Sequence, residues 1–385
     1  MTGRSSCGYA IQLSHSVKTH ACHWSRQGND STMNEEKPIK SDGFTLNAEA
    51  GTSVMREFLA RSPRTALEVQ VALNGEQWGW RHGKAEGVQS PVFEIGSVGK
   101  TFTTTLLALM VERQQVSLSD PVERFYPELP WGGNVTLQQL ASHTSGLPAN
   151  PFSQWQMVRR GRQLAEAFQE DDFIGFLQQL PTKLKAGSKA RYSNVGMALL
   201  GRILGDVCCQ SYGEAIQELI LWPLGMNDTC IDPSLHDKNR LIEGHDSRGR
   251  PVPPFTWKGM EAAGVWRSTC DDMMKFLRAQ LGFYGSPWDF LARRNTRVHA
   301  KMSRDTQIGL GWMVSTMKSG CTVAWHTGGT FGQHSMAAWS LEQSAAVVVL
   351  TDRMPPWWHH LLPSRQLELV PERLIAALSS EQSNA

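Results

Sequence analysis

Patterns typical of β-strands occur at both ends of this 385-residue chain, whereas its middle has the residue spacing of helices. Near the amino end, ALEVQVALNGEQWGWRHG alternates apolar and polar residues around Asn74-Gly75, a dipeptide typical of a tight hairpin turn. Toward the other end come IGLGWMVSTM, TVAWHTG, HSMAAWSLE and AAVVVLTD. Such strands can share a sheet only if the two ends of the chain meet, so the pattern predicts an antiparallel sheet assembled from both ends.

Helices are expected around this sheet. AGTSVMREFLARS (50–62) has helical spacing, STCDDMMKFLRAQL has an N-cap followed by acidic residues, and LELVPERLIAALSS closes the chain. SPVFEI is a third short strand, which leads into a helix beginning near GSVGKT. The expected fold class is therefore α+β, with helices flanking the sheet.

The same patterns divide the chain into regions. We predict a discontinuous sheet domain over 44–115 and 266–380, and a mostly helical region over 116–265, with a cleft between the two layers. Residues 1–43 are polar and lack any period, which predicts a disordered tail.

Composition narrows the classes of partner. The formal net charge is +2 and the basic residues are scattered, so a nucleic-acid partner is not expected. No apolar run approaches the ~20 residues of a membrane span, and the amino end lacks the pattern of a secretory signal. Seven cysteines, with Cys208 beside Cys209, are poor material for a disulfide framework. These features predict a cytoplasmic protein that acts on a small molecule.

No metal or other cofactor is expected. The segment HACHW places His20, Cys22 and His23 close together, but a structural zinc site needs a second ligand pair at suitable spacing. Only Cys7 and His15 are available for that role.

The segment GSVGKT is compatible with two unrelated chemistries. A phosphate-binding loop has the spacing Gly-x-x-x-x-Gly-Lys-[Ser/Thr], because the loop must wrap the phosphate with backbone N–H groups. Counting back from Gly99-Lys100, the first glycine of that motif would be residue 94, which is Glu94. Gly96 is two residues too close, so nucleotide binding is disfavoured.

The alternative is a serine nucleophile. Ser97 is expected at a strand-to-helix corner, where free N–H groups and partial positive charge are available. Lys100 follows at i+3, so its amine lies above the serine on the same helix face. Burial and the positive helix end would lower the pKa of Lys100 and leave a neutral amine that accepts the serine proton. Ser-x-x-Lys alone is too short to be specific.

Two further motifs support the nucleophile. Tyr192-Ser193-Asn194 opens a helix after a loop, and alternate side chains in an extended segment face the same way. His326-Thr327-Gly328-Gly329 ends a strand, where glycines would let a substrate approach the sheet edge closely.

Together the three motifs resemble the serine β-lactamase and penicillin-binding-protein superfamily, in its branch of class C β-lactamases, D-alanyl-D-alanine peptidases and esterases. That branch carries Ser-x-x-Lys, Tyr-x-Asn and Lys/His-Thr-Gly elements, matched here by SVGK, YSN and HTG. The segments LQQLASHTSGLP, LWPLGMNDT, STCDDMMKFL and IGLGW extend the resemblance over about residues 44–380. It implies the β-lactamase/transpeptidase-like fold.

The resemblance also implies roles for the residues. Ser97 would attack an ester or amide carbonyl to form an acyl-enzyme, with Lys100 and Tyr192 as proton-transfer groups. The backbone N–H groups of Ser97 and Gly329 would form the oxyanion hole. The substrate-binding residues would be Asn194, which holds the acyl amide, with His326, Thr327 and Gly328 along the cleft.

Two departures from the family pattern affect the expected substrate. Class C β-lactamases carry lysine where this chain has His326, which argues against efficient β-lactam hydrolysis. No counterpart of the deacylating glutamate of class A enzymes is found, so Tyr192 must serve. His143 in SHTSG is interpreted as a buttress of the cleft. Acyl transfer at the same site and a catalytically idle scaffold remain as alternatives.

Overall fold

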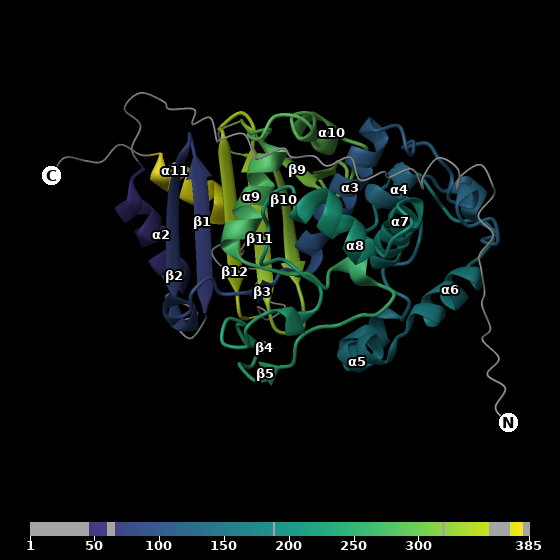
Figure 1. Ribbon diagram of the computed structural model, residues 1–385, viewed down its shortest axis with the longest axis horizontal. Coiled ribbons are helices and arrows are strands. Elements are labelled where there is room, and N and C mark those ends of the chain that lie inside the picture. Colours follow the sequence, from purple (N-terminus) through teal and green to yellow (C-terminus); the bar gives the residue numbers. More distant parts are fainter. Residues whose placement is uncertain (1–45, 60–65, 188, 318–319, 354–369, 380–385) are drawn as a thin grey trace.

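An antiparallel sheet of eight strands organises the part of the chain that the structure describes (Figure 1). The structure is a computed structural model and describes residues 46–59, 66–187, 189–317, 320–353 and 370–379. The predicted tail at 1–43 and the HACHW segment lie outside these residues. The strand order is β2 (Glu76–His82), β1 (Leu67–Leu73), β12 (Ala345–Thr351), β11 (His334–Ser340), β10 (Thr322–Gly329), β9 (Met313–Thr316), β8 (Gln307–Ile308) and β7 (Ala300–Lys301).

The sheet joins the two ends of the chain, as the sequence predicts. Strand β1 pairs on one side with β2 and on the other with β12, in register from Leu67↔Thr351 to Leu73↔Ala345. The β1–β2 hairpin turns at Asn74 (φ 50°) and Gly75 (φ 85°), two residue types that tolerate positive φ. The predicted α+β fold with a discontinuous antiparallel sheet is therefore confirmed.

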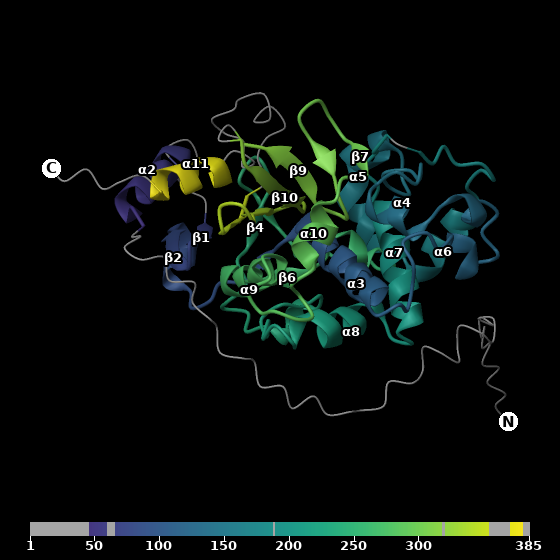
Figure 2. The same cartoon turned by 90° about the horizontal axis from the view of Figure 1, so that it is seen from above.

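Helices cover both faces of the sheet (Figure 2). Helices α2 (Ala48–Leu59) and α11 (Val370–Leu378) lie on one face, where Met55 and Leu374 pack with Val347 and Val349. On the other face lies α9 (Cys270–Gln280), and alternate residues of the same strand, including Val348, belong to the larger core on that side. Because both faces are covered, β1 and β12 are buried along their whole length.

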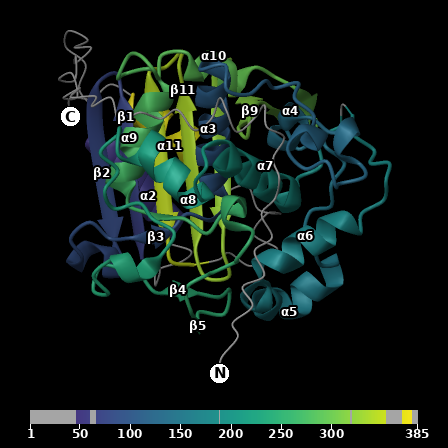
Figure 3. The same ribbon diagram turned by 45° about the vertical axis from the view of Figure 1, so that its right-hand side comes forward.

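Most of the remaining helices lie on the side of the molecule away from β1 and β2 (Figure 3). Helix α3 carries the SVGK lysine at its first position, and α7 begins at the asparagine of the YSN motif. The bounds of these helices are α3 (Lys100–Glu112), α4 (Leu137–Ala141), α5 (Gln154–Ala167), α6 (Glu170–Gln178), α7 (Asn194–Val207), α8 (Tyr212–Ile216) and α10 (Leu291–Thr296).

One short strand occurs as predicted, in a different sheet, and one strand prediction needs correction. The short strand in SPVFEI is β3 (Phe93–Glu94), which pairs with β6 (Arg267–Ser268) in a separate two-stranded sheet instead of joining the large one. The stretch IGLGWMVSTM is not one strand. Its alternation breaks at Gly311 (φ 69°), whose N–H donates to the Ala141 carbonyl and so separates β8 from β9. A further small sheet pairs β4 (Gly244–His245) with β5 (Pro251–Val252).

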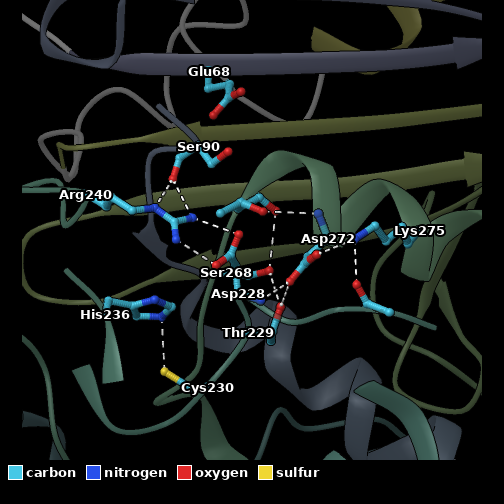
Figure 4. Close-up of polar contacts among 12 residues, drawn as sticks. Glu68, Ser90, Asp228, Thr229, Cys230, His236, Arg240, Ser268, Asp272 and Lys275 are labelled. Atoms are coloured by element: carbon cyan, nitrogen blue, oxygen red, sulfur yellow. Dashed lines mark hydrogen bonds and ion pairs between the residues drawn. The ribbon is translucent and has the colours of Figure 1, made fainter. Parts of the chain in front are cut away.

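The Asp272 side chain connects two segments that sequence analysis associated with the family, LWPLGMNDT and STCDDMMKFL (Figure 4). Thr269 caps α9 by accepting from the Asp272 N–H. Asp272 then accepts from the Asp228 N–H at 2.8 Å and from the Thr229 hydroxyl at 2.9 Å, and pairs with Lys275. This network fixes the start of α9 against the loop after α8.

Candidate active site

Ser97 and Lys100 lie in direct contact at the junction between β3 and α3. Ser97 is in a single 3-10 turn, Gly96–Gly99, and Lys100 is the first residue of α3. The Lys100 Nζ lies 2.9 Å from the Ser97 Oγ, as the i+3 spacing predicts. The same amine donates to the Ala263 carbonyl, so its orientation is fixed from a second side.

The environment of Lys100 favours its uncharged form. Its side chain is fully buried, and burial lowers the pKa of Lys100 well below its ordinary value. An isolated ammonium away from water loses its hydration, so the group releases its proton instead. A neutral amine beside a serine hydroxyl is the arrangement that a general base requires.

Tyr192 lies against the same pair. It immediately precedes Ser193, which caps α7, and the Lys100 Nζ is 5.1 Å from the centre of the Tyr192 ring. Burial raises the pKa of Tyr192, and a hydrogen bond with the Ser97 side chain opposes that rise only in part. The side chain is therefore a protonated phenol at neutral pH, able to donate a proton close to Ser97.

Two buried imidazoles flank the Tyr192 ring. The ring of His143 lies 4.5 Å from that of Tyr192, and the ring of His326 lies 6.2 Å away. Burial is the main cause that lowers the pKa of His143 and of His326 to about 3. Both imidazoles are neutral at physiological pH.

Backbone contacts select different tautomers for these two imidazoles. The His143 Nδ1 accepts from the Ser193 N–H at 3.2 Å, which leaves the proton on Nε2. The His326 Nδ1 donates to the Thr327 carbonyl at 2.6 Å, which leaves its Nε2 as an acceptor. Both Nε2 atoms are buried without a partner in the described part of the chain.

Asn194 also has one polar atom that is paired and one that is not. Its Nδ2 donates to the Asn150 Oδ1 at 2.7 Å, and its own Oδ1 is buried without a partner among the described residues. Buried polar atoms are normally hydrogen-bonded. The unpaired atoms of Asn194, His143 and His326 are therefore available to a bound molecule.

The end of β10 packs directly against the turn that carries Ser97. A side chain at Gly96 would lie 2.7 Å from the Gly329 nitrogen, and one at Gly328 would lie 1.9 Å from the Ile95 carbonyl oxygen. The Ser335 hydroxyl donates to that same oxygen at 2.7 Å. Gly328 thus lacks a side chain because the backbone at Ile95 packs directly against it. The sequence suggests another reason for this glycine, the close approach of a substrate.

Sequence reasoning missed the segment Ala263-Gly264. Gly264 has a φ of 132°, and a side chain there would lie 2.8 Å from the Ser97 nitrogen. The Ala263 carbonyl accepts from Lys100, so this segment contacts both motif residues. Asn150 was also missed. Short segments of this kind carry no local signal, because their place beside Ser97 follows from tertiary packing alone.

Other clusters lie apart from these residues. A cavity of about 450 Å³ is lined by a mainly apolar set that includes Glu94, Arg267 and Gln333 but not Ser97, Lys100 or Tyr192. No group of three or more His, Cys, Asp or Glu side chains suited to a metal occurs in the described ranges. Within those ranges, no helix combines the length and apolar character that crossing a bilayer demands.

Comparison with known sequences identifies relatives of this chain. The chain is 30% identical to a beta-lactamase of Escherichia coli (strain K12) over 235 residues, 58% of this chain and 57% of the relative. It is 28% identical to the D-alanyl-D-alanine-carboxypeptidase/endopeptidase AmpH of the same organism, over 69% of this chain and 71% of the relative. A beta-lactamase of Providencia stuartii is matched at 26% identity over 61% of its length. The match to the two beta-lactamases thus spans less than two thirds of their length.

Comparison with solved structures supports the same fold. A class C beta-lactamase matches with a TM-score of 0.73 and 20% identity, over 87% of this chain and 97% of that one. A class C beta-lactamase from Rhodobacter sphaeroides matches with a TM-score of 0.71 and 23% identity, over 86% of this chain and 100% of that one. The family model described as Beta-lactamase matches residues 53–369, which contain all three motifs. The chain belongs to the beta-lactamase family.

Proposed function

We propose that this protein is a serine hydrolase that cleaves an ester or amide bond of a small molecule through an acyl-enzyme on Ser97. The observation that carries the proposal is the 2.9 Å contact between the Ser97 Oγ and the amine of Lys100, a fully buried side chain whose burial lowers its pKa well below the ordinary value. Relatives named as a beta-lactamase and a D-alanyl-D-alanine-carboxypeptidase/endopeptidase support hydrolysis of amide bonds.

Acylation starts with proton transfer from Ser97 to Lys100. The neutral amine accepts the hydroxyl proton as the Oγ attacks the substrate carbonyl. The carbonyl oxygen becomes negative in the tetrahedral intermediate and accepts from the backbone N–H groups of Ser97 and Gly329. The close packing of Gly329 on Gly96 supports a shared position for these two donors.

Breakdown of the intermediate needs a proton on the leaving group. Tyr192 is protonated because burial raises its pKa, and it contacts the Ser97 side chain. The phenol donates to the leaving atom and recovers its proton from the Lys100 ammonium, whose burial favours loss of that proton. In deacylation the proton moves the opposite way: Tyr192 and Lys100 take a proton from the attacking water and return one to the Ser97 Oγ.

The substrate-binding groups are Asn194, His326, Thr327 and Gly328. Because His326 is neutral at physiological pH and offers an acceptor nitrogen, it suits a hydroxyl or N–H group of the substrate. Class C β-lactamases carry a lysine at this position, and a neutral imidazole lacks its charge. The site therefore fits an ester or an ordinary amide better than a β-lactam. A cytoplasmic location, suggested by the cysteine content, is part of the same proposal.

A covalent active-site probe tests the proposal. A fluorescent penicillin and a fluorophosphonate are each expected to label the wild-type protein, and Ser97→Ala is expected to abolish the labelling. Ser145→Ala is the matched control, because Ser145 is another buried serine and lies in the SHTSG segment. It is expected to keep its labelling.

Two outcomes would contradict the proposal. Failure of both probes to label a correctly folded wild-type protein would favour the idle scaffold. Labelling that survives Ser97→Ala would indicate another nucleophile. A panel of p-nitrophenyl esters, D-amino amides and nitrocefin then distinguishes ester, amide and β-lactam substrates, and an added alcohol acceptor tests for acyl transfer.

A further inference from the structure

The first turns of helix α5 expose two large apolar side chains to solvent. Trp155 is 66% exposed and Val158 is 81% exposed. The two lie three residues apart before the kink at Arg160, so they share one face of the helix. Single exposed apolar residues are ordinary. An exposed tryptophan beside an exposed valine on one helix face instead indicates a surface that contacts a protein or a lipid layer.

Basic residues accompany this apolar pair. The Arg159 guanidinium lies 4.7 Å from the centre of the Trp155 ring, and Arg160 is exposed at the kink. The segment from Gln154 to Arg160 contains no acidic residue. Trp155, Val158, Arg159 and Arg160 together are called the α5 face below.

The inner side of α5 fixes where the α5 face lies. Gly161 is buried, and a side chain there would lie 3.4 Å from the Phe331 ring, two residues beyond Gly329. Phe331 stacks edge-on against Phe255, which follows β5, at 5.4 Å between ring centres. Figures 1 and 3 both show α5 at the same end of the molecule as β4 and β5. The α5 face is therefore the outer side of an element that packs beside the end of β10.

We propose that the α5 face docks on an anionic lipid surface. An indole at the boundary between apolar and polar phases, next to arginines, is the combination found where helices bind such surfaces. The two arginines complement negatively charged headgroups. A protein partner fits less well, because a stable interface buries about 800 Å² on each side and a patch of two apolar side chains is much smaller.

This docking surface goes beyond the proposed hydrolysis and does not depend on it. If Ser97 is the nucleophile, docking through α5, which packs on Phe331 two residues beyond Gly329, would favour amphiphilic esters held in the lipid layer as substrates. That consequence alone rests on the proposed function. Lipid binding by Ser97→Ala separates the two ideas, because it measures docking without catalysis.

Sedimentation with vesicles tests the proposal. The full-length protein is incubated with vesicles of phosphatidylcholine alone or with 30% phosphatidylglycerol, and the bound fraction is measured at low and high salt. The wild type and Ser97→Ala are expected to bind the anionic vesicles equally, and more weakly at high salt. Trp155→Ser/Val158→Ser and Arg159→Gln/Arg160→Gln are each expected to lower the partition coefficient at least about tenfold.

Leu235→Ser is the matched control. Leu235 is 72% exposed but lies in the short turn Pro233–Leu235, away from α5 in the chain, so its replacement is expected to leave binding unchanged. Equal binding of wild type and the Trp155→Ser/Val158→Ser variant would overturn the proposal, as would binding that ignores vesicle charge. Sedimentation velocity without lipid adds a third outcome. A wild-type dimer that this variant dissociates would show that a second copy covers the α5 face.

Discussion

Acidification is expected to destabilise this protein through its two buried imidazoles, and His143 offers the clearest test. His143 faces Lys100, His326 and Tyr192, and its pKa is lowered from 6.5 to about 3. Between these two values the unfolded chain binds a proton at this position and the folded chain does not. The free energy of unfolding therefore falls as the pH falls from about 6.5 toward 3.

The magnitude follows from the shift. A pH of 5 lies about 1.5 units below the ordinary pKa of 6.5 that the imidazole has in the unfolded chain. Each unit corresponds to 1.36 kcal/mol, so His143 alone lowers the free energy of unfolding by about 2 kcal/mol between pH 8 and pH 5. The pKa of His326 is also lowered to about 3, so His326 adds a comparable loss. Such a sum is a large part of a typical folding stability of 5–15 kcal/mol.

Urea denaturation of wild type and His143→Asn at pH 8, 6 and 5 measures this effect. Asparagine retains an acceptor for the Ser193 N–H and tolerates the positive φ of 57° at this position. The variant is expected to lose about 2 kcal/mol less than the wild type between pH 8 and pH 5. Any difference already present at pH 8 reflects packing and is subtracted. Parallel pH profiles for the two proteins would refute the reasoning.

Three further predictions concern the surroundings of Ser97. Lys100→Met is expected to slow covalent labelling by a serine-directed probe about 100- to 10,000-fold, because the general base is lost; unchanged labelling would exclude Lys100 as the base. Gly264→Ala is expected to slow the same labelling about 100- to 1000-fold, because the new Cβ crowds the Ser97 N–H, and an unchanged rate would show that this N–H is not an oxyanion donor. Arg267→Met is expected to lower the free energy of unfolding by about 3–5 kcal/mol in urea, because Glu94 stays buried without its 3.2 Å partner. Adding Glu94→Leu is expected to restore part of that loss, and no recovery would contradict the ion-pair explanation.

Local patterns were sufficient to predict much of this fold. The patterns of ALEVQVAL and AAVVVLTD predicted two strands, β1 and β12, which pair along their whole length, and Asn74-Gly75 located the turn of the β1–β2 hairpin. The i+3 spacing predicted the contact of Ser97 with Lys100. Each of these features depends on residues close together in the chain or on a face repeated with a fixed period, so a single sequence contains the information. The proposed boundaries at 116 and 265 stay a prediction.

Contacts between distant segments could not be predicted in the same way. The Glu94–Arg267 pair joins residues 173 positions apart. It lies between β3 and β6, two paired strands that are each only two residues long. Strands this short have no detectable alternation. The position of Ala263-Gly264 beside Lys100 likewise depends on how the chain returns from the helical region, which no local pattern encodes.

The contacts of Ile95 explain why the late glycine motif matters to a serine more than two hundred residues earlier. The Ile95 carbonyl oxygen meets Gly328 of β10 and accepts from the Ser335 hydroxyl of β11, so two central strands hold the residue two positions before Ser97. Lys100 is held separately, by burial and by the Ala263 carbonyl. The hydroxyl and the amine thus belong to one helical turn that two supports hold, the central strands of the sheet at Ile95 and the Ala263-Gly264 segment, which contacts both residues. A shift of either support changes the 2.9 Å separation between Oγ and Nζ directly, because no flexible linker lies between the supports and the reacting atoms.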